Sequence, residues 1–173
     1  LSWLVNVDPQ VTQGQDSLYV GFGNATNAVL VNIALSAVAS SVDGTAYTSS
    51  MSVYSNGNWA TSNNVPGWVS QGTRAWINYY RPNSTTPTGD SPTATPWAIQ
   101  MVVPIGQFLD PGNTVKLQPA TDFKMWYDVI LYGPTESPPT HSQVILYTWP
   151  GTPDLTTNYP APSTWADARV SNI

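Results

Sequence analysis

The sequence predicts one all-β domain, a two-sheet antiparallel β-sandwich or jelly roll with long loops rich in Pro, Gly and Asn. Sixteen prolines and twelve glycines interrupt the 173 residues at short intervals, which leaves little room for helices of ordinary length. Between these breaks, apolar and polar residues alternate with a period of two. The spacing of the alternating runs predicts about six to nine strands.

The first half of the chain holds four of these runs. Leu1, Trp3, Val5 and Val7 alternate with other residues, so an extended strand is expected at the amino terminus. The runs 18–22, 29–35 and 51–53 each place apolar side chains on one face. Asn56-Gly57 follows the last of them and favours a tight hairpin turn, because Asn and Gly tolerate positive φ.

The second half holds three more runs. The run 97–105 predicts a core-facing strand whose further pairing is limited by Pro104. In the run 123–131, Trp126 and Ile130 make the second face apolar too, which predicts a strand that is central or covered on both sides. The run 144–149 ends at Pro150-Gly151, a turn signal.

The chain is interpreted as a single domain that spans residues 1–173. The Pro-rich stretch 81–96 is taken as a surface loop, because either half alone would have a small core. Residues 150–173 are expected to form an extended Pro-rich tail that packs on the domain, with Trp165 as its only large anchor. Ser163 or Thr164 offers a cap for a short terminal helix.

Composition excludes several classes of partner. Only 9% of the residues are charged, the five Lys and Arg residues are scattered, and the formal net charge is −5. Nucleic acids and anionic membranes are bound mainly through Lys and Arg, so neither is expected as a partner. The sequence has no apolar run of about 18 residues that could span a membrane as a helix.

A secreted or cell-surface location is expected from the polar but uncharged composition and from two glycosylation sequons, at Asn24 and Asn83. The chain contains no cysteine. Disulfides, thiolate metal sites and a cysteine nucleophile are therefore excluded.

Few acid–base residues are present. His141 is the single histidine and Glu136 the single glutamate, and no G-x-S-x-G motif occurs. General acid–base chemistry uses such groups, so we favour a protein without enzymatic activity. A secreted hydrolase that uses His141 or a pair of carboxylates is the third hypothesis.

No cofactor is expected, although a structural Ca²⁺ ion fits the composition. A zinc site is improbable with one His and no Cys. Calcium takes carboxylate oxygens from loops, and five aspartates lie in turn-like sequences. The preference of Asp for turns explains their presence there equally well. These are Asp8, Asp43, Asp90, Asp110 and Asp154.

The aromatic content suggests the first function. Eight Trp and nine Tyr residues are present, and several cluster in a region rich in Gly and Asn. Sugar rings stack on aromatic faces while amide side chains bond to hydroxyl groups, so this region predicts a non-enzymatic extracellular module that binds carbohydrate or a glycosylated surface. The alternative is that the tryptophans fill the ends of the sandwich. The candidate binding residues are Trp59, Trp68, Trp76, Tyr79, Tyr80, Asn58, Asn63, Asn64 and Gln71.

The amino-terminal strand suggests a second function. A strand that contains Leu1, Trp3, Val5 and Val7 could complete the sheet of a neighbouring copy, because strand addition supplies main-chain hydrogen bonds and side-chain pockets together. An almost uncharged surface also suits close packing. The alternative hypothesis is therefore a self-assembling extracellular structural subunit, such as a filament or capsid protein, whose partners are copies of itself.

Overall fold

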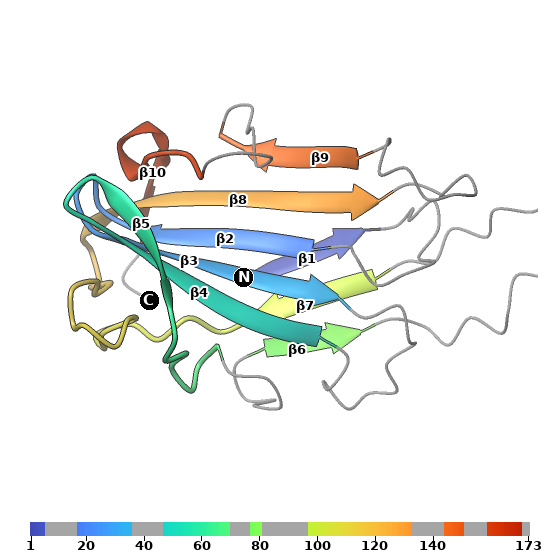
Figure 1. Ribbon diagram of the computed structural model, residues 1–173, viewed down its shortest axis with the longest axis horizontal. Helices are drawn as coiled ribbons and strands as arrows, with labels where there is room; N and C mark the ends of the chain where they lie inside the picture. The colour runs from blue at the N-terminus through green and yellow to red at the C-terminus, as the bar shows by residue number, and fades with distance from the viewer. Residues whose placement is uncertain are drawn as a thin grey trace, which may run out of the picture.

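The structure, a computed structural model, describes residues 1–5, 17–35, 47–69, 77–80, 97–132, 144–150 and 159–170. Within these ranges the chain forms ten β-strands and one short 3-10 helix, η1 (Pro162–Thr164). The strands form two antiparallel sheets that face each other, which confirms the predicted all-β sandwich (Figure 1). No helix in the described part of the chain is long and apolar enough to cross a membrane.

The smaller sheet has three strands. Its order is β1 (Ser2–Val5), β7 (Trp97–Met101) and β6 (Ile77–Tyr80). The predicted amino-terminal strand is present over Ser2–Val5, and it pairs with β7 of its own chain, with Trp3 opposite Ile99. Val7 lies outside the described residues.

The larger sheet has seven strands, in front of the smaller sheet in Figure 1. Four of them form a meander in chain order: β2 (Ser17–Gly23), β3 (Ala28–Leu35), β4 (Tyr47–Ser55) and β5 (Asn58–Ser62). The predicted hairpin turn between β4 and β5 is confirmed, with φ of 52° at Asn56 and 82° at Gly57. Positive φ at both central residues gives the turn the twist that a two-residue hairpin needs.

Strand β8 (Asp122–Tyr132) is an interior strand of the larger sheet, next to one edge. One of its edges pairs with β2, with Gly21 opposite Trp126. Its other edge is shared by two strands that lie end to end, β10 (Ala166–Arg169) and β9 (Val144–Trp149). This strand was predicted to be central or covered on both sides, and it is covered on both faces, because Tyr127 packs against the core between the sheets while Trp126 is buried on the outer face.

The main core lies between the two sheets. The alternating residues of β2, β3 and β4 point into it and meet β7 and the segment 103–117. Burial of each such side chain contributes about 1.5–3 kcal/mol relative to exposure. Its fully buried members include Leu18, Val20, Val29, Val31, Ile33, Met51, Met101 and Leu109.

One prediction about strand extent was wrong. The run 97–105 was expected to be one strand, but β7 ends at Met101, and Ile105 is 38% exposed. Pro104 cannot donate a ladder hydrogen bond, which explains the early end. The expected tail contains the strand β10, and Ala120 N donates to Val170 O beyond it.

Candidate functional site

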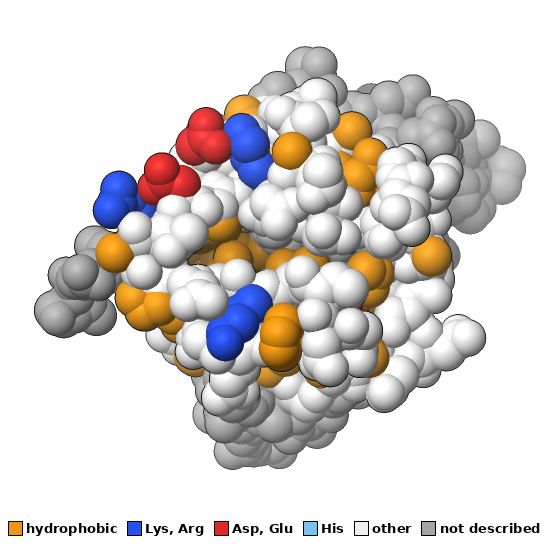
Figure 2. Space-filling model, turned by 90° about the vertical axis from the view of Figure 1, so that its left-hand side faces the viewer, with side chains coloured by type: hydrophobic (Ala, Val, Ile, Leu, Met, Phe, Trp, Pro, Cys, Tyr) orange, Lys and Arg blue, Asp and Glu red, His pale blue; other side chains and the backbone are white. Residues whose placement is uncertain are grey.

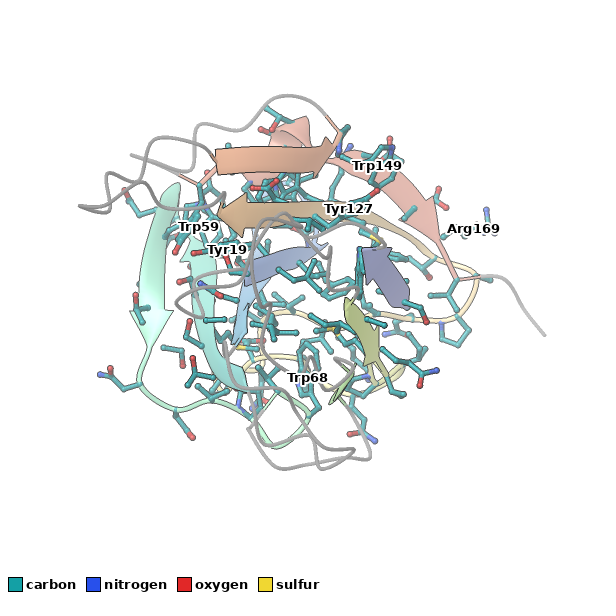
Figure 3. The ribbon with its side chains drawn as sticks, turned by 90° about the vertical axis from the view of Figure 1, so that its right-hand side faces the viewer. Tyr19, Trp59, Trp68, Tyr127, Trp149 and Arg169 are labelled. Atoms are coloured by element: carbon teal, nitrogen blue, oxygen red, sulfur yellow. The ribbon has the colours of Figure 1, made fainter. Side chains whose placement is uncertain are left out.

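One side of the sandwich is formed by the edges of both sheets. Strand β1 is at the edge of the smaller sheet, and β9 is at the edge of the larger one. An aromatic row connects them: the rings of Trp3 and Tyr127 meet edge to face at 6.1 Å, and those of Tyr127 and Trp149 stack at 6.0 Å. Figure 3 shows Tyr127 and Trp149 beside each other at this side. We call β1, β9 and these three rings the lateral face.

Large apolar side chains are exposed on or near the lateral face. Trp149, the last residue of β9, is 41% exposed although one face of its ring lies on Tyr127. Leu1 is 50% exposed, and it lies beside Met101 because Met101 N donates to Leu1 O. Val102 follows Met101 and is 47% exposed. Exposed large apolar side chains are unusual enough on a folded domain that those of the lateral face mark it as a candidate interaction surface.

The edge strands of this protein are almost free of charge. In the described part of the chain, nothing pairs with the outer edges of β1, β5, β6 or β9, and none of these four strands contains Asp, Glu, Lys or Arg. Proteins commonly protect such edges with charged side chains, Pro or bulges, because unpaired N–H and C=O groups accept a strand from another chain. Among the edge strands that the structure describes, only β10 carries charged side chains, on Asp167 and Arg169.

The exposed charges that the structure describes gather at one end of the sandwich, next to a hollow with a hydrophobic floor (Figure 2). Lys124 and Asp167 form an ion pair of 2.8 Å, and the Arg169–Asp122 pair measures 3.6 Å. Lys116 lies 5.4 Å from the centre of the Phe108 ring. Among the residues that the structure describes, exposed charge therefore lies at this end and not on β1, β5, β6 or β9.

The structure separates two of the predicted carbohydrate-binding tryptophans. Trp68 belongs to the main core: it is 6% exposed, and its indole N–H donates to Leu109 O at 2.9 Å. Trp59 lies on the outer face of the larger sheet, in a second hydrophobic cluster with Trp126 and Trp165. These two rings therefore lie on opposite faces of one sheet and form no common platform (Figure 3).

The other predicted binding residues are only partly described. Asn58, Asn63 and Asn64 are exposed around the β5 strand, and the Asn58 side chain donates to Asn56 O. Tyr79 and Tyr80 belong to β6, where only the backbone is described. Trp76 and Gln71 lie outside the described residues.

The outer-face cluster is filled by the chain's own carboxy-terminal segment. The Trp165 ring lies between Trp59, at 5.9 Å, and Trp126, at 6.2 Å, in nearly parallel stacks. Tyr159 contacts Trp59 and Tyr19 at 5.7 and 5.9 Å. The indole N–H groups of Trp59 and Trp165 are buried with no hydrogen-bond partner among the residues described. Each such group costs about 1–3 kcal/mol when buried unpaired.

The sequon at Asn24 occupies the exposed turn between β2 and β3. Its side-chain oxygen Oδ1 accepts hydrogen bonds from Thr26 N, Thr26 Oγ1 and Asn27 N at 2.8–2.9 Å. These hydrogen bonds involve only Oδ1. The amide nitrogen, which is the atom that carries a glycan, belongs to the same exposed side chain and takes no part in them. Asn83 lies outside the described residues.

One of the candidate calcium ligands is described. Asp110 is 4% exposed, and its carboxylate accepts hydrogen bonds from Thr114 N, Thr114 Oγ1 and Val115 N. The loop's own donors therefore occupy it. Within the described ranges no three His, Cys, Asp or Glu residues are grouped as a metal site. Asp8, Asp43, Asp90, Asp154, His141 and Glu136 lie outside those ranges.

Sequence reasoning did not single out Trp149 and Tyr127, since it treated both as ordinary members of strands. The exposure of Trp149 follows from its place at the end of a strand that lies at the edge of the sheet, which the sequence does not show. Comparisons with protein-family models, with curated proteins and with solved structures give no match for this chain.

Proposed function

We propose that this domain is an extracellular structural subunit that associates with copies of itself through the lateral face. The observation that carries the proposal is the aromatic row Trp3–Tyr127–Trp149, which connects the charge-free edge strands β1 and β9 and leaves the ring of Trp149 41% exposed. An edge of this kind is a template for pairing, and apolar side chains next to it supply the hydrophobic contribution to association.

The distribution of charge supports this choice of surface. Ionic groups in the middle of an interface lose hydration when they are buried, so interfaces between copies are depleted of them at their centre. The described charges lie at the end of the sandwich that carries β10, and the strands β1 and β9 have none. The lateral face can therefore be covered without desolvating a charge of either strand.

The test places a charge on the lateral edge. Ser2→Lys alters an exposed residue of β1, and Thr61→Lys makes the same kind of change on β5, at the far edge of the larger sheet. Light scattering over a concentration series is expected to show a wild-type mass above that of one chain. The Ser2→Lys variant should weaken association at least about tenfold, which corresponds to about 1.4 kcal/mol.

The matched control decides the position of the interface. Thr61→Lys should associate like the wild type, and circular dichroism should show all three proteins folded. A wild-type chain that stays monomeric at its highest soluble concentration would overturn the proposal. Equal weakening by both substitutions would show that charge acts through general repulsion and would overturn the lateral face as the interface.

Carbohydrate binding is the second candidate function, and the residue that supports it is Trp149. Its ring is 41% exposed and is held in place by stacking on Tyr127, so it offers a pre-arranged aromatic surface of the kind that stacks on sugars. Titration with cellulose, chitin, mannan and host-type glycans tests this function. Trp149→Ala should abolish binding, whereas Phe108→Ala, which removes a ring that is 47% exposed elsewhere, should not. No binding by the wild-type chain would exclude this candidate for the glycans tested.

A further inference from the structure

We call residues 159–170 the carboxy-terminal arm. The chain leaves the larger sheet after β9, and the arm returns to the same edge of that sheet as β10. Strand β9 ends opposite Tyr127, and β10 begins opposite Met125. These two positions on β8 are about 7 Å apart. The chain nevertheless uses residues 150–165 to join them, and part of that stretch covers the outer face of the sheet.

The arm docks on the sheet as a separate peptide would. Its strand β10 adds to β8 through main-chain pairing, with Asp167 opposite Lys124. The side chain of Trp165 fits over Gly21, where no Cβ is present to obstruct the ring. Strand addition combined with a side-chain pocket is a recurring mode of peptide recognition, in which the ladder gives affinity and the pocket gives specificity.

The dock is continuous with the lateral face. Strands β10 and β9 occupy the same edge of β8, so a second copy that approaches β9 also approaches the site of the arm. Residues 151–158 connect Pro150 to the arm. Eight residues reach at most roughly 27 Å when fully extended, which sets the limit on the distance over which the arm can exchange.

We propose that the arms are exchanged between associated copies, so that Trp165 of each subunit lies over Gly21 of its neighbour. This inference rests on the proposed self-association and assigns the carboxy-terminal arm as the element that stabilises it. Exchange preserves every contact that the arm makes, because a second copy offers the same β8 edge and the same outer-face cluster. A two-fold arrangement allows both arms to exchange at once.

The test uses the absence of cysteine from the chain. Two variants are prepared separately, Lys124→Cys and Asp167→Cys, whose positions face each other in the β8–β10 ladder. They are mixed, allowed to associate and treated with a short bis-maleimide. Exchange predicts a covalent two-chain product in the mixture, with at least about tenfold less in either variant alone. A double variant with both substitutions in one chain is the reference: an arm that docks on its own subunit gives a cross-link within one chain.

Two controls separate specific docking from collision. Thr61→Cys replaces Lys124→Cys in a parallel mixture and should give only background product, since Thr61 lies on β5. Trp165→Ala, added to the Asp167→Cys chain, should lower the two-chain yield because it removes the anchor of the arm. Equal yields with Thr61→Cys would overturn the inference.

The outcomes also separate this inference from the proposed function. Association by light scattering together with a one-chain product only would show that the arms stay on their own subunits, so exchange would be wrong while self-association stands. Absence of association would overturn both.

Discussion

The six-membered ring of Trp165 occupies the space that a side chain at Gly21 would need. A Cβ built at Gly21 would overlap Cη2 and Cζ3 of that ring, so the two residues depend on each other. The outer-face cluster exists because one position in the middle of β2 has no side chain.

This dependence predicts a strong coupling. Gly21→Ala should lower the free energy of unfolding by about 1–3 kcal/mol, because the ring cannot move away without losing its stacks on Trp59 and Trp126. In a Trp165→Ala background the same change should be close to neutral, since Ala is a better strand residue than Gly. Urea unfolding of the four proteins of the cycle measures the coupling. Equal costs of Gly21→Ala in both backgrounds would contradict it.

Trp68 is predicted to act in the core and not in ligand binding. Trp68→Phe should cost about 2 kcal/mol, because it leaves the carbonyl oxygen of Leu109 buried without its indole donor. Trp68→Phe should leave glycan affinity, if any is found, and association unchanged. Denaturant unfolding checks the first result. A Trp68→Phe variant as stable as the wild type would show that the indole N–H is not needed.

Asp110 is predicted to hold its loop together. Asp110→Ala removes the acceptor for Thr114 N and Val115 N, and a loss of about 1–3 kcal/mol is expected because Val115 is buried. Asp110→Asn keeps Oδ1 and should lose less than half as much. Thermal unfolding of both variants distinguishes them. If Asp110→Asn were as damaging as Asp110→Ala, the negative charge itself would be the stabilising feature.

Asn24 is predicted to accept a glycan without loss of its turn. Expression through a eukaryotic secretory pathway should add mass at the tryptic peptide that contains Asn24, since the hydrogen bonds of the turn use Oδ1 only. Thr26→Ala should abolish the modification, and its effect on stability should be under about 1 kcal/mol because the site is exposed. Mass spectrometry gives the answer. An unmodified Asn24 in a chain that reaches the medium would refute the prediction.

The sequence predicted the strands well where one face is buried. In β2 and β3 the alternation marks the core directly, and Leu18, Val20, Val31 and Ile33 are all fully buried. Strand β10 was missed because the alternation of Ala-Asp-Ala-Arg covers only four residues and its apolar side chains are small: its contacts come from the ladder with β8 and from Trp165 just before it. Pairing of that kind depends on the partner strand and leaves only a weak signal in the sequence.

The candidate sites were harder to predict than the strands. Trp59 and Trp68 are nine residues apart in a region that looks uniform in sequence, yet they lie on opposite faces of the larger sheet. The face of Trp59 is set by its register opposite Tyr54, and the position of Trp68 by its bond to Leu109. The register is local to the β4–β5 hairpin, whereas the bond to Leu109 joins residues 41 positions apart. Composition could show that aromatic residues were abundant, but only the fold shows which ring faces solvent.

The stack of Trp59, Trp165 and Trp126 also makes the arm visible to spectroscopy. The three indole rings lie about 6 Å apart from centre to centre and belong to a hydrophobic cluster. Departure of Trp165 would expose the rings of Trp59 and Trp126 to water, which shifts tryptophan fluorescence to longer wavelength. The protein therefore carries an intrinsic optical reporter of the position of its own carboxy-terminal arm.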